Sequence, residues 1–441
     1  MATPSEQPDR PTRGSAGAGA DAGAGAALGP GPTDAPDPRL GGSDPRGLGA
    51  APGAGAADAT PPSASSTPAP TSAGRESRAP AGESRLIGFL RELTETYGPP
   101  GREDAVREAI RARVEAWADE VRVDALGNLI ARRSPRGGAG AGARTGGAGG
   151  GGGAGRSGHR VMVAAHMDEI ALIATHIDDR GFIRVEPVGG QDPLVLVGQR
   201  VAFAGGVVGV VACERLDSPR DLKMGKLYVD IGAPSGDAAR QRVRVGDMAV
   251  FHRPLERAGS RLVAKALDDR SGCAVLMEAM ARLKESPHEV PHEVFFVFTV
   301  QEEVGLRGAR TAAFAVEPDV AVAVDVTVAG DTPEPEHRLA VELGKGPAIT
   351  VKDNSQIVHP LVRRWMETTA QAEGIPYQLE VRPFGGTDAG AMQLVRAGVP
   401  AGTLSIPIRH VHTPGEMVDA DDLEHAVRLL VAMLQRPLPA A

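Results

Sequence analysis

The sequence predicts an α/β fold with a mostly parallel central sheet flanked by helices and a small inserted β-barrel domain. From residue 268 onward, helical and strand-like segments alternate, and the strand 293–300 (EVFFVFTV) is apolar on both faces. Helices must therefore cover both sides of its sheet. Between about 171 and 262, short β-type runs alternate with Gly, Pro and Asp without a useful helical period. That pattern is typical of a small barrel or sandwich.

Composition divides the 441 residues into ordered and low-complexity parts. Residues 1–82 are rich in Ala, Gly, Pro and Ser and have almost no large apolar side chains, so we expect a disordered tail, and no apolar run marks a signal peptide. The Gly-rich stretch 136–158 is expected to be a flexible insertion. The catalytic domain is then expected over 83–170 and 263–437, with the β-domain inserted at 171–262.

The individual elements follow from apolar spacing. Leu86 to Leu93 recur at helical spacing in a segment that ends at Gly98, and a second helical stripe runs from Val106 to Trp117. The strands expected before the insertion are 121–123, 129–131 and 160–165. The elements expected after residue 268 are helices 269–284, 306–315, 356–373, 388–397 and 420–435, and strands 293–300, 319–325, 377–381 and 401–406.

Several function classes are disfavoured by composition. No run of about 18 apolar residues is present, so no membrane span is expected. The net charge is −8 and no basic stripe carries interleaved aromatic residues, so nucleic acid is not an expected partner. Cys213 and Cys273 are far apart and form no CxxC pattern, which excludes a disulfide framework and favours a reducing cytoplasm.

Acidic and histidine-bearing segments recur at predicted strand ends, where open α/β sheets bind their ligands. Their residue types suit a pair of divalent metal ions. The five segments are AAHMDEI (164–170), KALDDRSG (265–272), TVQEEVGLRGA (299–309), AVDVTVAGD (323–331) and RHVHTPGEM (409–417).

The first two segments each contain a candidate metal ligand, and each also allows a simpler structural interpretation. His166 and Asp168, two residues apart on extended chain, share a face, so that the imidazole could ligate a metal while the carboxylate orients it. A surface His–Asp pair at a strand end is the alternative. Asp269 fits ordinary helix capping, whereas Asp268, which directly follows Ala266-Leu267, could bridge two cations.

The remaining segments complete a ligand set. Adjacent Glu302 and Glu303 point to different sides and repel unless a cation or a shared proton compensates them. We therefore assign Glu303 as a ligand and Glu302 as a general base, with a helix N-terminal acidic pair as the alternative. Asp325 offers a carboxylate at the end of an apolar run, and either His410 or His412 could ligate, since both share a face.

A further segment, Gly385 to Asp388, fits either a plain turn with a helix cap or a position near the substrate.

Together these motifs resemble the tetrahedral (TET) aminopeptidases, a family of glutamyl-aminopeptidase-like metallopeptidases in which some members are labelled endoglucanase. The resemblance covers roughly residues 84–436. Besides the five segments, it includes PVGGQDPLVLVGQRV (187–201), GKGPAI (344–349) and GGTDAG (385–390). It implies a zinc-exopeptidase-like fold with an inserted β-domain. It also implies two divalent ions per subunit, usually zinc or cobalt, and assembly into a homo-oligomeric dodecamer.

The family pattern also implies a role for each site residue. His166 and Asp325 would hold one ion, Glu303 and His412 the other, and Asp268 would bridge the two. Glu302 would be the general base and acid, and Asp168 would orient His166. Three features depart from the family pattern: the N-terminal tail, the tract at 136–158, and His410 at a position where an aromatic residue is more frequent.

The predicted function is therefore metal-dependent removal of N-terminal residues from short peptides. A deacylase or other amidohydrolase could use the same metal pair. A polysaccharide hydrolase would leave His166 and His412 without a role, because glycosidases generally need two carboxylates and no transition metal. A non-catalytic scaffold would have no need to keep the costly buried carboxylates.

Overall fold

The computed structural model describes residues 83–136, 158–333 and 339–440. The expected tail 1–82 and residues 137–157 of the expected glycine-rich insertion lie outside the described residues. The helices are α1 (Arg85–Glu95), α2 (Asp104–Val114), α3 (Pro193–Leu196), α4 (Gly236–Arg240), α5 (Leu267–Glu285), α6 (Arg307–Val316), α7 (Pro360–Glu373), α8 (Asp388–Met392) and α9 (Ala420–Leu434), with short 3₁₀ helices η1 (Pro219–Asp221) and η2 (Met224–Lys226). None of the helices in these ranges has the length and hydropathy that a membrane crossing requires.

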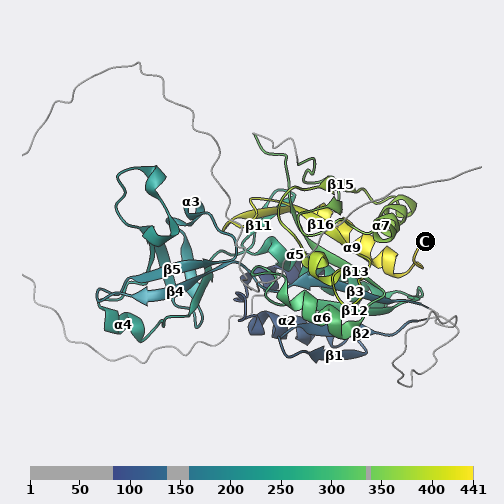
Figure 1. Cartoon of the computed structure of the whole chain (residues 1–441), viewed down its shortest axis with the longest axis horizontal. Helices are drawn as coiled ribbons and strands as arrows, with labels where there is room; N and C mark the ends of the chain where they lie inside the picture. Colours follow the sequence, from purple (N-terminus) through teal and green to yellow (C-terminus); the bar gives the residue numbers. More distant parts are fainter. Residues whose placement is uncertain (1–82, 137–157, 334–338, 441) are drawn as a thin grey trace, which may run out of the picture. The chain divides into compact units, whose positions relative to one another are not determined.

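An 11-stranded sheet forms the larger part of the fold, and its centre is parallel (Figure 1). Strands β12, β3, β13 and β16 lie side by side in that order and run parallel, while the outer pairings with β2, β14 and β17 are antiparallel. The sheet consists of β1 (Glu120–Val123), β2 (Leu129–Arg133), β3 (Arg160–His166), β10 (Glu256–Ala258), β11 (Arg261–Ala264), β12 (Glu293–Thr299), β13 (Val320–Val328), β14 (Ala348–Lys352), β15 (Gln378–Val381), β16 (Ala401–Arg409) and β17 (Glu416–Asp419).

Helices cover both faces of this sheet because its central strands are apolar on both faces over most of their length. In β13 the valines at 320, 322 and 324 pack in the core that contains α5 and α9, whereas Ala321 and Ala323 face α6 and α8. The small alanines of β13 meet Ala309, Ala312 and Ala313 of α6 on that second face. Alternate residues of a strand point to opposite faces, so each strand supplies two cores.

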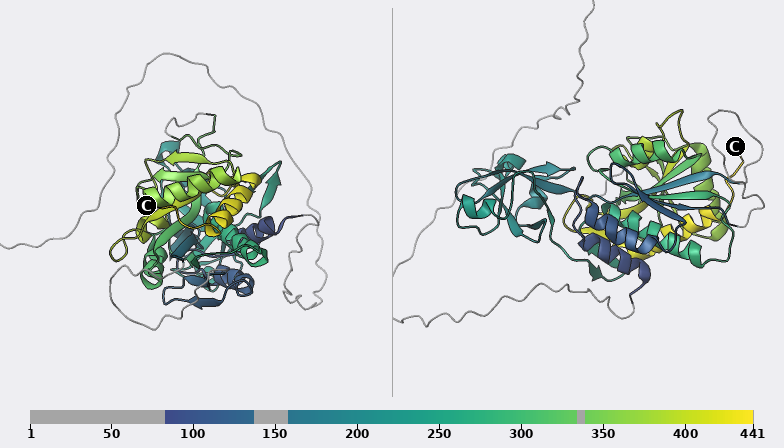
Figure 2. Two further views of the ribbon diagram at one scale, coloured as in Figure 1. Left: turned by 90° about the vertical axis from the view of Figure 1, so that its right-hand side faces the viewer. Right: turned by 90° about the horizontal axis from the view of Figure 1, so that it is seen from below.

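A second group of strands closes into an antiparallel barrel, ordered β4-β5-β8-β7-β6-β9 (Figure 2). Its interior is apolar and includes Leu172, Ile183 and Phe251. Its strands are β4 (Ala171–Ile177), β5 (Ile183–Val188), β6 (Arg200–Phe203), β7 (Val208–Cys213), β8 (Leu227–Asp230) and β9 (Met248–Phe251). The parallel sheet centre with helices on both faces, together with this barrel, confirms the predicted fold class.

Some local boundaries differ from the sequence-based expectation. The helix expected over 356–373 begins only at Pro360, because proline disfavours helical backbone in the residue before it and removes one N–H donor. The helix expected over 388–397 ends at Met392, and Arg396 then takes a left-handed conformation. The strands β10 and β11 lie around the end of the expected 171–262 segment and belong to the large sheet rather than to the barrel: β11 pairs with β17, and β10 pairs with β11.

Candidate metal centre

The five acidic and histidine-bearing segments meet at one edge of the large sheet. His166 ends β3 and pairs in register with Thr299, the last residue of β12, which leads to Glu302 and Glu303. Asp325 lies in β13, the parallel neighbour of β3. Since parallel strands end at the same sheet edge, these side chains converge. Asp268 in the first turn of α5 and His412 in the loop between β16 and β17 complete the cluster.

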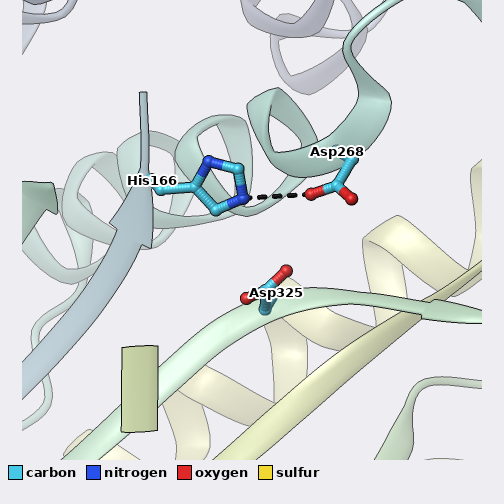
Figure 3. A group of neighbouring side chains, drawn as sticks. All are labelled: His166, Asp268 and Asp325. Carbon is cyan, nitrogen blue, oxygen red and sulfur yellow. Dashed lines mark hydrogen bonds and ion pairs between the residues drawn. The ribbon is translucent and has the colours of Figure 1, made fainter. Parts of the chain in front are cut away.

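Within the cluster, two sets of three residues have ligand atoms within 4.8 Å of one another. The first is His166, Asp268 and Asp325, whose side chains point toward one another in Figure 3. The second is Asp268, Glu303 and His412. Asp268 belongs to both, with Oδ1 3.0 Å from His166 Nε2 and Oδ2 3.4 Å from His412 Nε2. A carboxylate that offers one oxygen to each side has the arrangement needed to bridge two cations.

Burial and mutual contacts shift the pKa values of these groups away from their ordinary values. Burial raises the pKa of Glu303 to about 8 and that of Asp325 to about 7. Burial alone would lower the pKa of His412, but contact with Asp268 and the charge of Glu303 raise it to about 10. For Asp268, burial is outweighed by its contacts with His166 and His412, which hold its pKa well below the usual range. Crowded carboxylates of this kind favour a shared proton or a cation.

Glu302 belongs to neither set of three in the described residues. Its Oε2 lies 3.9 Å from His166 Nε2, and the side chain lines the same cavity as the donor atoms. Burial raises its pKa well above the usual value for a glutamate. The position suits proton transfer at the edge of the donor groups.

Asp168 is fully buried and contacts both halves of the centre. The His166 Nδ1 atom lies 3.1 Å from the Asp168 carbonyl oxygen and 3.6 Å from its Oδ1. The carboxylate also accepts hydrogen bonds at 3.0 Å from the backbone N–H groups of Glu302 and Glu303. Asp168 therefore fixes the Glu302–Glu303 backbone as well as facing the imidazole, a contact that the sequence did not indicate.

Two further glutamates hold the loops of the centre, and sequence reasoning missed both. Glu416 accepts from Asp268 N at 3.1 Å and from His412 N at 2.9 Å. Glu103 accepts from Gln301 N at 3.1 Å, and burial raises its pKa to about 7. Glu416 lies in the HTPGEM segment, but its contact with a residue 148 positions away leaves no local signal.

The other polar residues that the motifs singled out do not join the donor sets in the described chain. Asp269 accepts from His166 N at 3.2 Å and from Gly272 N at 2.8 Å, as a buried cap does. Asp388 accepts from Thr299 Oγ1 at 2.5 Å. His410 takes a left-handed conformation and donates no atom to either donor set.

A loop that follows barrel strand β5 approaches the second donor set closely. A Cβ atom at Gly189 would lie 3.2 Å from Glu303 Oε2, and one at Gly190 would lie 3.1 Å from His412 Nδ1. Glycine permits this approach because it carries no side chain. The cavity in front of the donors has a volume of about 540 Å³, and Phe384 and Val411 are among its apolar lining residues.

Known proteins are similar to this chain in sequence and in fold. The profile of the M42 glutamyl aminopeptidases matches residues 151–429. A protein of Acetivibrio thermocellus is 45% identical over 350 residues, 79% of this chain and 98% of its own. The lysyl aminopeptidase of Pyrococcus furiosus is 35% identical, and the match covers 80% of this chain and 97% of that protein. The structure of the TET1 peptidase of Pyrococcus horikoshii matches this fold with a TM-score of 0.66 and 33% sequence identity, and the match covers 79% of this chain and 99% of that chain. The resemblance indicated by the motifs is thereby confirmed, and the chain belongs to the M42 glutamyl aminopeptidase family.

Proposed function

We propose that this chain is a metal-dependent aminopeptidase that holds two divalent ions and removes N-terminal residues from short peptides. The observation that carries the proposal is the Asp268 carboxylate, whose two oxygens lie 3.0 and 3.4 Å from two different histidines. Each histidine belongs to a separate set of three donors. Membership of an aminopeptidase family supports the same reaction class.

The donor atoms fit two divalent cations. His166 and Asp325 would hold one ion, Glu303 and His412 the other, and Asp268 would bridge them. Mixed imidazole and carboxylate donors suit zinc and cobalt. The raised pKa values of Glu303 and Asp325 support this assignment. Burial makes the ionised form of these carboxylates unfavourable, and a bound cation would stabilise that form.

The protein's own groups would then move the protons of hydrolysis. When bound, the ions would polarise the scissile carbonyl and make the attacking water more acidic. Glu302 accepts the proton of that water and passes it to the leaving amine. Asp168 keeps Glu302 in place through its backbone N–H, at 3.0 Å, and faces His166 from the other side.

Assembly and location follow as parts of the same proposal. The Pyrococcus horikoshii TET1 peptidase assembles into a tetrahedron or a large octahedral shell, and we expect a homo-oligomer, with a dodecamer as the leading stoichiometry. We place the protein in the cytoplasm. Light scattering of the full chain tests the assembly, and a monomer would contradict it.

The test of the function is cleavage of aminoacyl-p-nitroanilides after metal removal with EDTA and after return of zinc or cobalt. We expect activity only with metal and only on free amino termini. An N-acetylated set of the same compounds provides the matched control. Cleavage of the acetyl group would favour the deacylase alternative, and metal binding without turnover of any compound would contradict the aminopeptidase.

A further inference from the structure

A second cavity, of about 730 Å³, lies beside the barrel strands β6 and β9. It is larger than the cavity in front of the metal donors, which has about 540 Å³, and the two share no lining residue. One wall consists of barrel residues, and the other includes Tyr97 and Lys265 of the larger part of the fold. The Tyr97 hydroxyl, which donates to Met248 O of β9 at 3.0 Å, joins the two walls. The cavity is therefore a separate candidate for ligand binding.

The barrel wall of this cavity is the outer face of the β6–β9 pair. Val201 and Phe251 lie opposite each other in register, and both belong to the barrel core. Because alternate residues of a strand point to opposite faces, Arg200, Ala202 and Val250 point outward, where they line the cavity. This wall therefore places a cationic side chain beside apolar surface.

The charged groups at the barrel end of the cavity are mostly cationic and lack carboxylate partners. Arg200 forms no side-chain hydrogen bond or ion pair with any described residue, and Arg253 donates only to the amide oxygen of Gln199, at 2.9 Å. Glu95 is the one acidic side chain in the described lining. Its Oε1 already accepts from Leu255 N at 3.2 Å. The two guanidinium groups are therefore available to an external anion.

Lys265 brings a buried cation to the same cavity. Its side chain is 4% exposed, and its ammonium donates to the two oxygens of Glu169 at 2.8 and 2.6 Å. An ammonium has three N–H groups, so at least one of them has no partner among the described residues. Glu169 is also shared with buried Arg270, whose Nη2 lies 3.4 Å from Oε1. One carboxylate thus contacts two buried cations, and an anion in the cavity would add to the compensation of their charge.

We propose that this cavity binds a small organic carboxylate with an apolar body, at a site separate from the metal donors. Arg200 and Arg253 would hold the carboxylate, because a guanidinium can donate two parallel hydrogen bonds to it. Their backbones are close, since Arg200 O accepts from His252 N, in the residue before Arg253, at 2.9 Å. Lys265 would contribute positive charge from the other wall. The inference does not depend on the proposed aminopeptidase function, because none of these residues belongs to either donor set.

The lining favours an organic carboxylate over the simpler ligands. An inorganic anion would leave the apolar surface of Ala202 and Val250 uncovered. A neutral apolar ligand would leave the cations of the cavity without compensation. A volume of about 730 Å³ is within the range of small-molecule sites.

Isothermal titration calorimetry of the metal-loaded full chain tests the proposal, with 3-phenylpropionate as the probe. This compound joins a carboxylate to an apolar ring, and 3-phenylpropionamide is the neutral probe of nearly the same size. We expect the acid to bind about 10-fold or more tightly than the amide, the effect of hydrogen bonds to a charged group.

Variants on the barrel wall locate the binding. Arg200→Gln combined with Arg253→Gln changes two exposed side chains and should weaken the binding of phenylpropionate about 10-fold. Ala202→Leu fills part of the apolar wall without a change of charge and should also weaken binding. Arg180→Gln, at a side chain 79% exposed on the barrel, is the matched control and should keep the native affinity. Thermal melting checks that each variant folds.

The metal centre is the competing site for a carboxylate, so the titration is repeated after EDTA treatment and dialysis. We expect the affinity for phenylpropionate to stay unchanged without metal. Binding that disappears with the metal, equal affinity for the acid and the amide, or native affinity in the folded double variant would overturn the proposal. So would the absence of detectable binding, or inorganic phosphate that binds as tightly as phenylpropionate. The assay measures binding alone, so failure of the proposed aminopeptidase activity would not affect its outcome.

Discussion

Without bound metal, the free energy of unfolding of the protein should fall as pH rises from about 5 to about 8. In the metal-free fold, burial raises the pKa of Glu303 and of Glu416 to about 8, whereas the ordinary value for a glutamate is 4.5. The folded state therefore holds more protons than the unfolded chain in this window. The resulting stability is fully present below the unfolded pKa and is lost as pH rises through the folded pKa.

The magnitude follows from the number of retained protons. Each extra proton in the folded state lowers the free energy of unfolding by about 1.4 kcal/mol per pH unit as pH rises. If the cluster retains one proton between pH 5 and pH 7, the fall is about 3 kcal/mol. His412, with its pKa raised to about 10, acts in the same direction above its ordinary value of 6.5. Asp268, whose pKa is lowered, acts oppositely but only in acid, below the window.

The assay is urea unfolding of EDTA-treated and zinc-loaded protein at pH 5, 6, 7 and 8. Zinc should stabilise more at pH 8 than at pH 5, because the ligands must be deprotonated to bind it. Glu416→Gln removes one of the titrating groups and should flatten the metal-free slope. A metal-free stability that is constant or increases from pH 5 to pH 8 would refute the linkage between these carboxylates and the fold.

Three further changes separate the roles of residues in the centre. Glu302→Gln should keep the metal content and lose about 10²- to 10⁴-fold in kcat, the usual contribution of a general base; near-native turnover would remove Glu302 from that role. Asp168→Asn cannot accept from both backbone N–H groups, so the unfolding free energy should fall by about 2 kcal/mol or more, and unchanged denaturation would contradict the contact. Gly190→Ala should displace His412 and lower kcat by about 10- to 100-fold, whereas Gly225→Ala, where a Cβ meets no atom within 4 Å, should leave kcat unchanged.

The fold could be predicted where a single segment carries its own signal. The apolar run of β12 requires cover on both faces, and the structure places it between β2 and β3 inside the sheet. The strand β17 was missed, since EMVD is short and half polar, and only its pairing with β11 and β16 makes it a strand. The late start of α7 has a local signal in Pro360, the first residue of the helix.

The candidate site divides in the same way. His166 could be singled out because the end of its strand can be located from the sequence, and parallel strands end together. Asp325 is expected at a strand end but lies three residues before the end of β13, and Asp268 lies in the first turn of α5. The contacts of Glu416 and Glu103 could not be predicted, because each reaches a loop more than 100 residues away in sequence. The approach of Gly190 to His412 also depends on how the barrel loop lies against the centre. A Gly-Gly pair in the sequence allows such a close approach but does not predict it.

The loops of the centre explain why its charge is so one-sided. Hydrogen bonding between strands stops where a strand ends, so the N–H groups of the following loop need other acceptors when they are buried. Here buried carboxylates supply them: Asp168 for Glu302 and Glu303, and Glu416 for Asp268 and His412. Once ionised, the acceptors that position the donor groups therefore add negative charge beside them; for Glu416, whose pKa burial raises to about 8, this requires a higher pH or a bound cation. It follows that replacing Glu416 with glutamine should weaken metal binding even though Glu416 is not itself in either donor set, and calorimetric zinc affinity equal to that of the native chain would contradict this coupling.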